Sequence, residues 1–350
     1  MTSFVSKGEN RGFSRREFLG GLAALGGAAL LYSPLSAQTG NTAPRRIIDV
    51  HHHIMPPFYI REHRRDQLNV GPGITAIFEW TPQLSIERMD ASGVATSILS
   101  ISTPGTWFGE VEDGRWLSRE VNEYAAKMCR DYPGRFGFFA EIPLADVDGS
   151  LKEIEYALDT LKADGIGIMT SYSSIPPGVK QFEPVFRELN RRKAIVFMHR
   201  TMPSCCMNLR EGSTDKEFII DDYRAINSLL TSGTLARNPD MTLIHAHGDK
   251  TLPYVAHHGP ANPPEWAPQG VAAQLQKVYV DTAGNTQDTM DDLRELGMMD
   301  RIMFGTDHPY GGQNAIAGNR QRLLGFNLSQ TELDAIGRET AVRLFPKFKA

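Results

Sequence analysis

The sequence predicts an α/β fold, a (β/α)8 barrel, and three observations lead to this prediction. Short apolar runs rich in Val, Ile, Phe and Leu alternate with helical patterns along the chain. Glycines follow several of the helical patterns, where a left-handed terminal residue favours glycine. Histidines and an aspartate follow the ends of apolar runs, which is where barrel enzymes of this type place their active sites. The alternative is an open doubly wound sheet, but no glycine-rich phosphate loop follows the first strand.

The expected elements alternate regularly from residue 47 to the C-terminus. We expect strands at residues 47–51, 94–101, 136–141, 166–170, 195–199, 242–246, 278–282 and 301–305. We expect helices at residues 85–92, 116–131, 149–163, 181–192, 222–236, 270–276, 286–296 and 329–344. The glycines expected just after helices are Gly93, Gly134, Gly165, Gly233 and Gly297. Strands that alternate with helices in this way form a parallel sheet that closes into a barrel.

The N-terminal segment is predicted to be an export signal and not part of the fold. The stretch Ser14 to Leu19 contains the pair Arg15-Arg16 and matches a twin-arginine signal, and a Gly- and Ala-rich apolar stretch follows it. We therefore expect a signal peptide at residues 1–37, a linker at 38–46 and a barrel domain at 47–350. The expected partner is the twin-arginine export machinery and the expected location is the periplasm. An uncleaved leader or a chance pair of arginines is the alternative.

Composition narrows the class of protein. The chain has 350 residues, of which 41% are hydrophobic and 22% charged, and this suits a globular enzyme-sized domain. The net charge of -4 argues against a nucleic-acid partner, which would require a basic face. No run of about 20 apolar residues lacks Gly and Pro, so we expect no stable membrane span. Cys129, Cys205 and Cys206 do not suggest a disulfide framework.

A metal site is predicted from the residues at the strand ends. His51 and His53 alternate with His52 at the end of the first strand, so they share one face and can bind the same divalent cation. Farther along, His199, His247 and Asp307 each follow another apolar run. The C-terminal ends of barrel strands meet around the barrel axis, so all five side chains are expected to converge there.

Several motifs in the chain resemble those of the amidohydrolase superfamily, in particular its group of aminocarboxymuconate-semialdehyde and 6-methylsalicylate decarboxylases. The stretches that carry the resemblance are residues 48–57, 80–94, 131–137, 196–199, 246–253 and 304–309. The resemblance implies that His51, His53, His199 and Asp307 bind a divalent metal and that His247 acts as the acid or base. It also implies a homodimer.

The chain departs from the family pattern at four places. Arg200 follows His199 where proline is usual, Asp249 replaces a glycine, and His308 follows Asp307 where tyrosine is frequent. Ala76 stands where the muconate decarboxylase has a substrate-binding arginine. Of the substrates of the two enzymes that the chain resembles, the resemblance therefore favours an aromatic acid such as a salicylate over a muconate.

The chemistry of these residues allows two reactions. Imidazole and carboxylate ligands suit Zn2+, and also Mn2+ or Co2+. The metal would bind the carboxylate and hydroxyl oxygens of a small aromatic or enol carboxylic acid, and Asp307 or His247 would protonate the carbon that loses carbon dioxide. Trp80 and Arg200 are the candidate substrate-binding residues. Trp107 and Phe108, in the loop after the second strand, can line the substrate pocket or simply pack. Hydrolysis of a lactone, ester or amide uses the same residues, and a catalytically silent periplasmic binding protein is a third possibility.

Other histidines and acids near these motifs have predicted roles. His52 is expected to face away from the site and pack in the core. His245 can line the site or be structural, and Asp49 can orient a ligand or be structural. His257 and His258 are expected in a solvated loop. Asp281, at the end of the seventh strand, is expected to bond a histidine or to cap the next helix.

Overall fold

The computed structural model describes residues 46–68, 74–202, 214–248, 250–260 and 262–349. These residues belong to a compact unit that runs from Asn41 to Ala350. The predicted signal peptide and nearly all of the predicted linker lie outside the described residues. Within the described part of the chain, none of the helices has both the length and the apolar character needed to span a bilayer.

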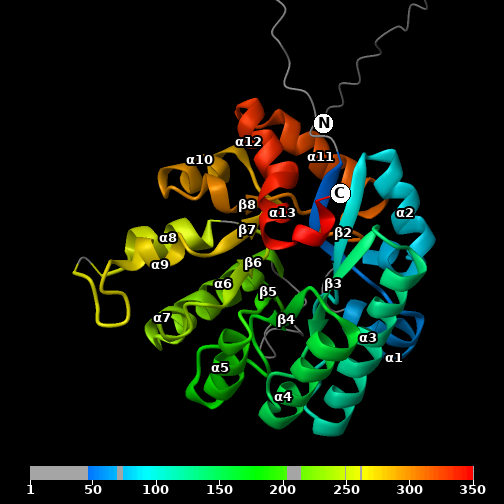
Figure 1. The fold of residues 1–350 in the computed structure, drawn as a ribbon, viewed down its shortest axis with the longest axis horizontal. Coiled ribbons are helices and arrows are strands. Elements are labelled where there is room, and N and C mark those ends of the chain that lie inside the picture. Colours follow the sequence, from blue (N-terminus) through cyan, green and yellow to red (C-terminus); the bar gives the residue numbers. More distant parts are fainter. Residues whose placement is uncertain (1–45, 69–73, 203–213, 249, 261, 350) are drawn as a thin grey trace, which may run out of the picture. The chain divides into compact units, whose positions relative to one another are not determined.

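Eight parallel strands follow one another around the sheet in chain order (Figure 1). They are β1 Ile47–His53, β2 Val94–Ser100, β3 Phe136–Glu141, β4 Gly165–Met169, β5 Ile195–His199, β6 Thr242–His245, β7 Tyr279–Asp281 and β8 Ile302–Met303. The first strand also bonds to the segment that follows β8: the Val50 amide donates to Phe304 O at 2.9 Å and the His53 amide donates to His308 O at 2.7 Å. These bonds close the sheet, so the predicted barrel is confirmed and the open doubly wound sheet is wrong.

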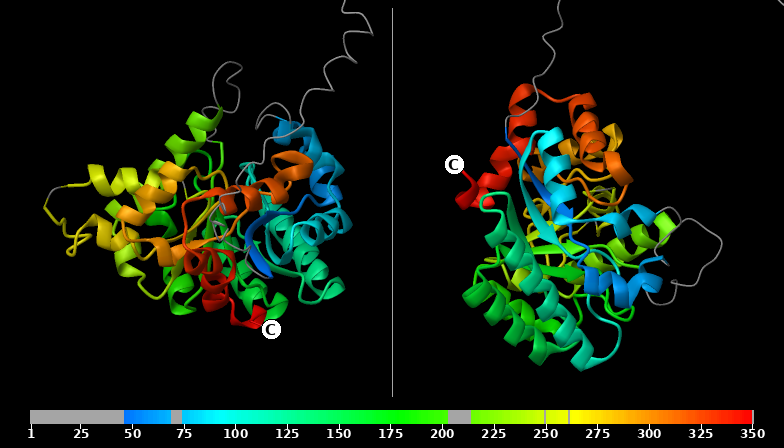
Figure 2. Two further views of the ribbon diagram at one scale, coloured as in Figure 1. Left: turned by 90° about the horizontal axis from the view of Figure 1, so that it is seen from above. Right: turned by 90° about the vertical axis from the view of Figure 1, so that its right-hand side faces the viewer.

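The helices surround the strands, except that α13 lies across one end of the barrel (Figures 1 and 2). They are α1 Pro57–Leu68, α2 Pro82–Ala91, α3 Val111–Asp131, α4 Val147–Glu155, α5 Glu183–Arg191, α6 Thr214–Thr231, α7 Thr234–Arg237, α8 Thr251–His258, α9 Val271–Leu275, α10 Gln287–Glu295, α11 Ala315–Gly325, α12 Gln330–Asp334 and α13 Thr340–Leu344. Each predicted helix overlaps at least one of these. The α2 helix starts earlier than predicted because Thr81 caps it: its Oγ1 accepts from the Leu84 amide at 3.1 Å.

Several details of the prediction are wrong, and helices α1 and α11 were not predicted. The segment 222–236 is two helices, because Gly233 at φ 74° ends the first with a left-handed residue. His257 and His258 are exposed as expected, but they belong to helix α8 and not to a loop. Gly165 begins β4 and caps no helix; a Cβ there would lie 2.5 Å from Ile195 O, so glycine is needed for strand packing.

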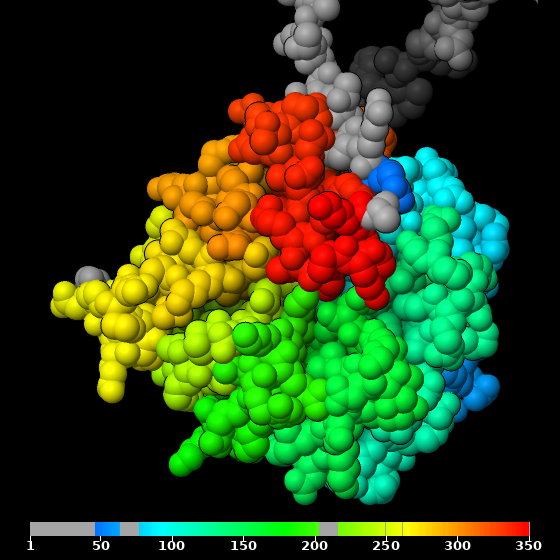
Figure 3. Space-filling view, viewed as in Figure 1, coloured from blue at the N-terminus to red at the C-terminus, as the bar shows by residue number. Residues whose placement is uncertain are grey.

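The barrel interior is filled by a separate set of apolar side chains. These are Ile48, Val50, Ile98, Phe139, Phe197, Ile244, Ala246, Tyr279, Met303, Ala341, Phe345 and Phe348. The last three come from the C-terminal segment, which lies in the middle of the face shown in Figure 3. The strands run away from this plug, so their C-terminal ends open at the opposite end of the barrel.

Candidate metal centre

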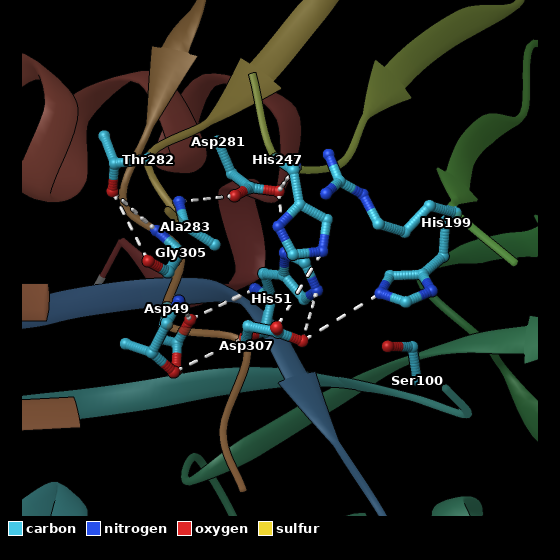
Figure 4. A network of polar contacts seen from close by, with 12 residues as sticks. Asp49, His51, Ser100, His199, His247, Asp281, Thr282, Ala283, Gly305 and Asp307 are labelled. Atoms are coloured by element: carbon cyan, nitrogen blue, oxygen red, sulfur yellow. Dashed lines mark hydrogen bonds and ion pairs between the residues drawn. The ribbon is translucent and has the colours of Figure 1, made fainter. Parts of the chain in front are cut away.

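Four of the predicted site residues point toward one another at the C-terminal ends of the strands (Figure 4). His51, His199, His247 and Asp307 each offer one ligand atom, and these atoms lie within 4.8 Å of one another. His53 joins them: its Nε2 is 3.0 Å from Nε2 of His51 and 2.9 Å from Oδ1 of Asp307. The structure therefore brings together all five residues that the strand-end pattern singled out.

A bulge in β1 aims the first two histidines into the barrel. The register against β2 shifts between Asp49 and His52. Val50 packs in the interior, and His51 still lies against Phe197 of the same interior, with ring centroids 5.3 Å apart. Strict alternation would place these neighbours on opposite faces, so the bulge re-aims His51 and separates it from the face of Asp49.

Asp49 and His52 form a buried layer behind the site. Asp49 Oδ2 accepts from Thr306 Oγ1 at 2.6 Å and lies 3.2 Å from His52 Nδ1. His52 Nε2 is 2.9 Å from Ser85 Oγ. His52 thus faces away from the site, as predicted, and Asp49 holds the segment before Asp307 instead of a ligand ring.

Asp281 supports the centre from β7. Its Oδ2 lies 2.9 Å from Nδ1 of His51 and also accepts from the His247 amide at 3.2 Å. Glycines make room for it, since a Cβ on Gly305 would lie 2.6 Å from Asp281 Oδ1 and one on Gly248 would lie 2.5 Å from Asp281 O. Of its two predicted roles, Asp281 takes the bond to a histidine.

The donor atoms of His199 and His247 are left for another partner. Both ring nitrogens of His199 and Nε2 of His247 are buried with no hydrogen-bond partner among the described residues. Buried polar atoms are rarely left unpaired unless they serve a ligand, an ion or water. His53 differs, because its Nδ1 is 2.9 Å from Ser100 Oγ, which leaves Nε2 to face the cluster.

The charges of the cluster suit a cation. Burial and neighbouring positive charge hold the pKa values of His199 and His247 well below the ordinary range, so both rings are neutral. Burial opposes ionisation of Asp307, but the surrounding histidines hold its pKa well below its ordinary value. Burial also lowers the pKa of His51, yet Asp281 and Asp307 outweigh it and raise that pKa to about 10. The carboxylates of Asp281 and Asp307 thus attract positive charge to this end of the barrel.

Two of the site residues have left-handed backbones. His247 has φ 62° and Asp307 has φ 57°. Such a conformation costs a non-glycine residue about 1–3 kcal/mol and is retained mostly at functional sites. Ile244 in β6 and Ala246 just after it face the interior, so His245 lies on the other face. The left-handed turn at His247 returns that ring to the site.

Neutral imidazoles and an ionised carboxylate are the donors that divalent zinc, manganese or cobalt binds. The unpartnered nitrogens of His199 and His247 therefore fit a divalent metal together with His51, His53 and Asp307. A quarter of the Asp307 side chain is exposed, so the cluster is open to a substrate.

The two predicted substrate-binding residues lie in different surroundings. Arg200 follows His199 and pairs with buried Asp222 at 2.9 Å, and its charge lowers the pKa of His247. Trp80 is buried, donates to Ser85 Oγ at 2.9 Å and packs near Tyr124. Arg200 thus lies close to the cluster, whereas Trp80 packs beside α2 and α3.

A cavity of ≈ 140 Å³ opens in the loops after β2, β4 and β5. Its lining residues are Pro104, Trp107, Phe108, Ser171, Tyr172, Ser173, Thr201 and Met202. Sequence reasoning considered Trp107 and Phe108 as lining but missed the rest, and it also missed Ser100 beside His53. The signal that points to them is their position just after strand C-termini.

The family profile described as Amidohydrolase matches residues 48–347. The chain belongs to the amidohydrolase family. This amidohydrolase is 34% identical over 331 residues to decarboxylase yanB of Aspergillus niger, covering 86% of this chain and 88% of that protein. It is 33% identical to the 6-methylsalicylic acid decarboxylase of Penicillium expansum, covering 86% and 97% of the two chains.

A solved structure with the same fold is the dihydroxybenzoic acid decarboxylase of Polaromonas sp. JS666, which holds manganese and the inhibitor 2-nitroresorcinol. Its TM-score to this amidohydrolase is 0.74 at 20% identity, and the match covers 87% of this chain and 98% of that one.

Proposed function

We propose that this amidohydrolase is a metal-dependent, non-oxidative decarboxylase of a small aromatic acid with a hydroxyl ortho to the carboxylate. The observation that carries the proposal is the cluster of four histidines and Asp307, in which the ring nitrogens of His199 and Nε2 of His247 have no hydrogen-bond partner among the described residues. Relatives that are 33–34% identical across 86% of the chain are named as decarboxylases, one of them acting on 6-methylsalicylic acid.

In this proposal His51, His53, His199 and Asp307 hold the metal, with zinc as the expected ion and manganese or cobalt as alternatives. The metal bound by the Polaromonas enzyme is manganese, which supports a divalent ion in this fold without choosing among the three. When bound, the ion supplies Lewis-acid attraction for the carboxylate and phenolate oxygens of the substrate.

The chain's own groups then move one proton. Neutral His247 takes the proton of the substrate's phenol hydroxyl and passes it to the ring carbon that bears the carboxylate, and the phenol oxygen later regains a proton from water. Burial lowers the pKa of this imidazole, so its protonated form is a strong donor. The bond between that carbon and the carboxylate breaks, its electron pair returns to the ring, and carbon dioxide leaves. No redox partner is needed. Arg200, held by Asp222, supplies positive charge near the substrate carboxylate.

We also propose that the chain is exported by the twin-arginine machinery to the periplasm and works as a homodimer. The Arg15-Arg16 pair and the apolar stretch after it support export. The resemblance to family members that form dimers supports the assembly.

The test is a carbon dioxide assay on the metal-loaded mature protein with ortho- and para-hydroxybenzoates. Ortho acids present two oxygens to one ion, so we expect them to turn over far faster than para acids. Equal rates on the two, or ester hydrolysis without carbon dioxide, would favour a hydrolase instead.

A further inference from the structure

The cavity is lined by loops that directly follow β2, β4 and β5, and β2 and β5 end at residues of the site. Thr201 lines it and is two residues beyond His199. Thr103 Oγ1 lies 3.0 Å from Thr201 Oγ1, and the loop that contains Thr103 begins after Ser100, whose hydroxyl lies 2.9 Å from His53 Nδ1. β2 and β5 thus end beside the cluster, at Ser100 and His199, and the loops that follow them form walls of the cavity.

The size and lining of the cavity define the group that it can receive. Its volume is ≈ 140 Å³, close to the roughly 150 Å³ of an engineered cavity that binds benzene. The described lining contains no charged side chain, and Trp107, Phe108, Tyr172 and Met202 are its large members. Burying a charged group here would leave that charge unpaired, so the cavity selects an uncharged group.

The hydroxyls of the lining are already engaged. Ser171 Oγ donates to Asp221 Oδ2 at 2.9 Å, and Thr201 is bonded to Thr103. Trp107 Nε1 donates to Ser173 Oγ at 3.2 Å, which links the loop after β2 to the loop after β4. An alkyl group therefore fits this lining better than a group that needs several hydrogen bonds.

The walls are fixed before any ligand arrives. Tyr59 donates to Gly105 O at 2.8 Å, and Thr106 Oγ1 lies 2.7 Å from Ser118 Oγ, so the loop with Trp107 is anchored at both sides. Ser173 and the next residue, Ser174, have left-handed φ values of 49° and 64°. Strained non-glycine residues concentrate at ligand sites, and here they present Ser173 to Trp107.

We propose that this cavity receives an alkyl substituent of the aromatic acid, and that Trp107 and Met202 set the size it accepts. This inference rests on the proposed function and adds to it the two residues that limit the size of the substituent. The described lining offers no charged partner to a second carboxylate or a charged amine in the same position.

The experiment measures kcat/KM for salicylates that carry a methyl or a propyl group, in the wild type and in Trp107→Ala. Opening the wall should raise the propyl-to-methyl ratio about tenfold or more, because one methylene in a hydrophobic pocket is worth about 10- to 200-fold. Trp116→Ala is the matched control, since Trp116 is half exposed on α3 and is not part of the lining. It should leave the ratio unchanged.

Met202→Ala provides the same test if Trp107→Ala fails to fold. Unchanged ratios in a folded variant that still releases carbon dioxide would overturn the inference and leave the proposed function intact. If no acid releases carbon dioxide, the proposed function fails. Calorimetric binding of methyl- and propyl-substituted 2-nitrophenols to wild type and variant then tests separately whether the cavity accepts the alkyl group. An affinity ratio that shifts toward propyl in the variant supports the cavity, and an unshifted ratio refutes it.

Discussion

Nδ1 of His51 lies 2.9 Å from Oδ2 of Asp281, which joins two fully buried side chains that are 230 residues apart in the chain. With a pKa of about 10, His51 would release the proton on Nε2 when it binds a metal and keep the proton on Nδ1, which it shares with this carboxylate. The Nε2 lone pair would then face Asp307 and His53. Ligating histidines are commonly oriented by such a carboxylate, which fixes the tautomer and raises the basicity of the ligand.

Asp281→Asn should therefore weaken metal affinity by about 10- to 100-fold, the usual effect of losing such a supporting group. The measurement is metal competition with a chromophoric chelator on the purified chain. Asp221→Asn is the control, because Asp221 is also buried but bonds Thr170 and Ser171. If both variants bind metal as the wild type does, Asp281 has only a packing role.

His247→Ala should keep the metal and lose about 100- to 10,000-fold in kcat, the range that general acid–base groups supply. Its Nε2 lies 3.8 Å from Asp307 Oδ2, farther than the 2.9 Å that separates His53 from the same carboxylate, so the other donors can hold an ion without it. Metal content and carbon dioxide release are measured on the same sample. If kcat of the variant stays within about threefold of the wild type, His247 only lines the site. His258→Ala, at an exposed position, is the control.

Much of the barrel could be predicted because polar or charged residues stand at the ends of its short apolar strands. The β5 strand was predicted to its last residue, His199, and β3 over its full length. The last strand was harder: β8 comprises only Ile302–Met303, because the residues after it bond to β1 instead of continuing the pairing with β7. Helix α8 was missed since Pro253 in its first turn resembles a loop signal, although proline is tolerated there.

The five residues lie together, as the pattern of strand ends indicated, but simple alternation was not the reason for the geometry. Ile48 and Val50 fill the interior, so an unbroken strand would have turned His52 inward. The bulge after Asp49 reverses this, and a single sequence does not show where a bulge falls. Asp281 could only be given alternative roles, because its contact with His51 depends on barrel closure and on the space left at Gly305.

Arg200→Gln should raise KM for the aromatic acid by about 10- to 100-fold, because a hydrogen bond to a charged group is worth about 1.5–3 kcal/mol. Arg200 is held 2.9 Å from Asp222, so its guanidinium stays beside the cluster. Steady-state kinetics give KM and kcat separately. Arg119→Gln is the control, since Arg119 forms an ion pair with Glu153 between α3 and α4. An unchanged KM in Arg200→Gln would remove Arg200 from substrate binding.

Replacing both Arg15 and Arg16 with lysine should block export and leave an active enzyme in the cytoplasm, because the arginine pair is read by a receptor and precedes the barrel. Fractionation followed by the carbon dioxide assay measures both effects. Lys7→Arg, outside the pair, is the control. Periplasmic levels equal to those of the wild type would contradict the export proposal.

Glu141 should make the barrel less stable as the pH rises. This residue ends β3, is 1% exposed, and its Oε1 has no hydrogen-bond partner among the described residues. Burial raises the pKa of Glu141 well above its ordinary value. The folded chain then keeps a proton that the unfolded chain releases above about pH 4.3, so the free energy of unfolding falls by up to about 1.4 kcal/mol per pH unit until the folded pKa is reached.

Glu141→Gln removes this ionisation and keeps the shape of the side chain. Its buried amide adds a cost that does not depend on pH, so the slope of stability against pH is the informative quantity. Urea unfolding between about pH 5 and pH 7 should show the variant gaining stability relative to the wild type as the pH rises. Glu155→Gln, on the exposed side of α4, should leave the slope unchanged. Parallel curves for wild type and Glu141→Gln would mean that Glu141 ionises at the same pH in the folded and unfolded chains, and its burial would then carry no proton linkage.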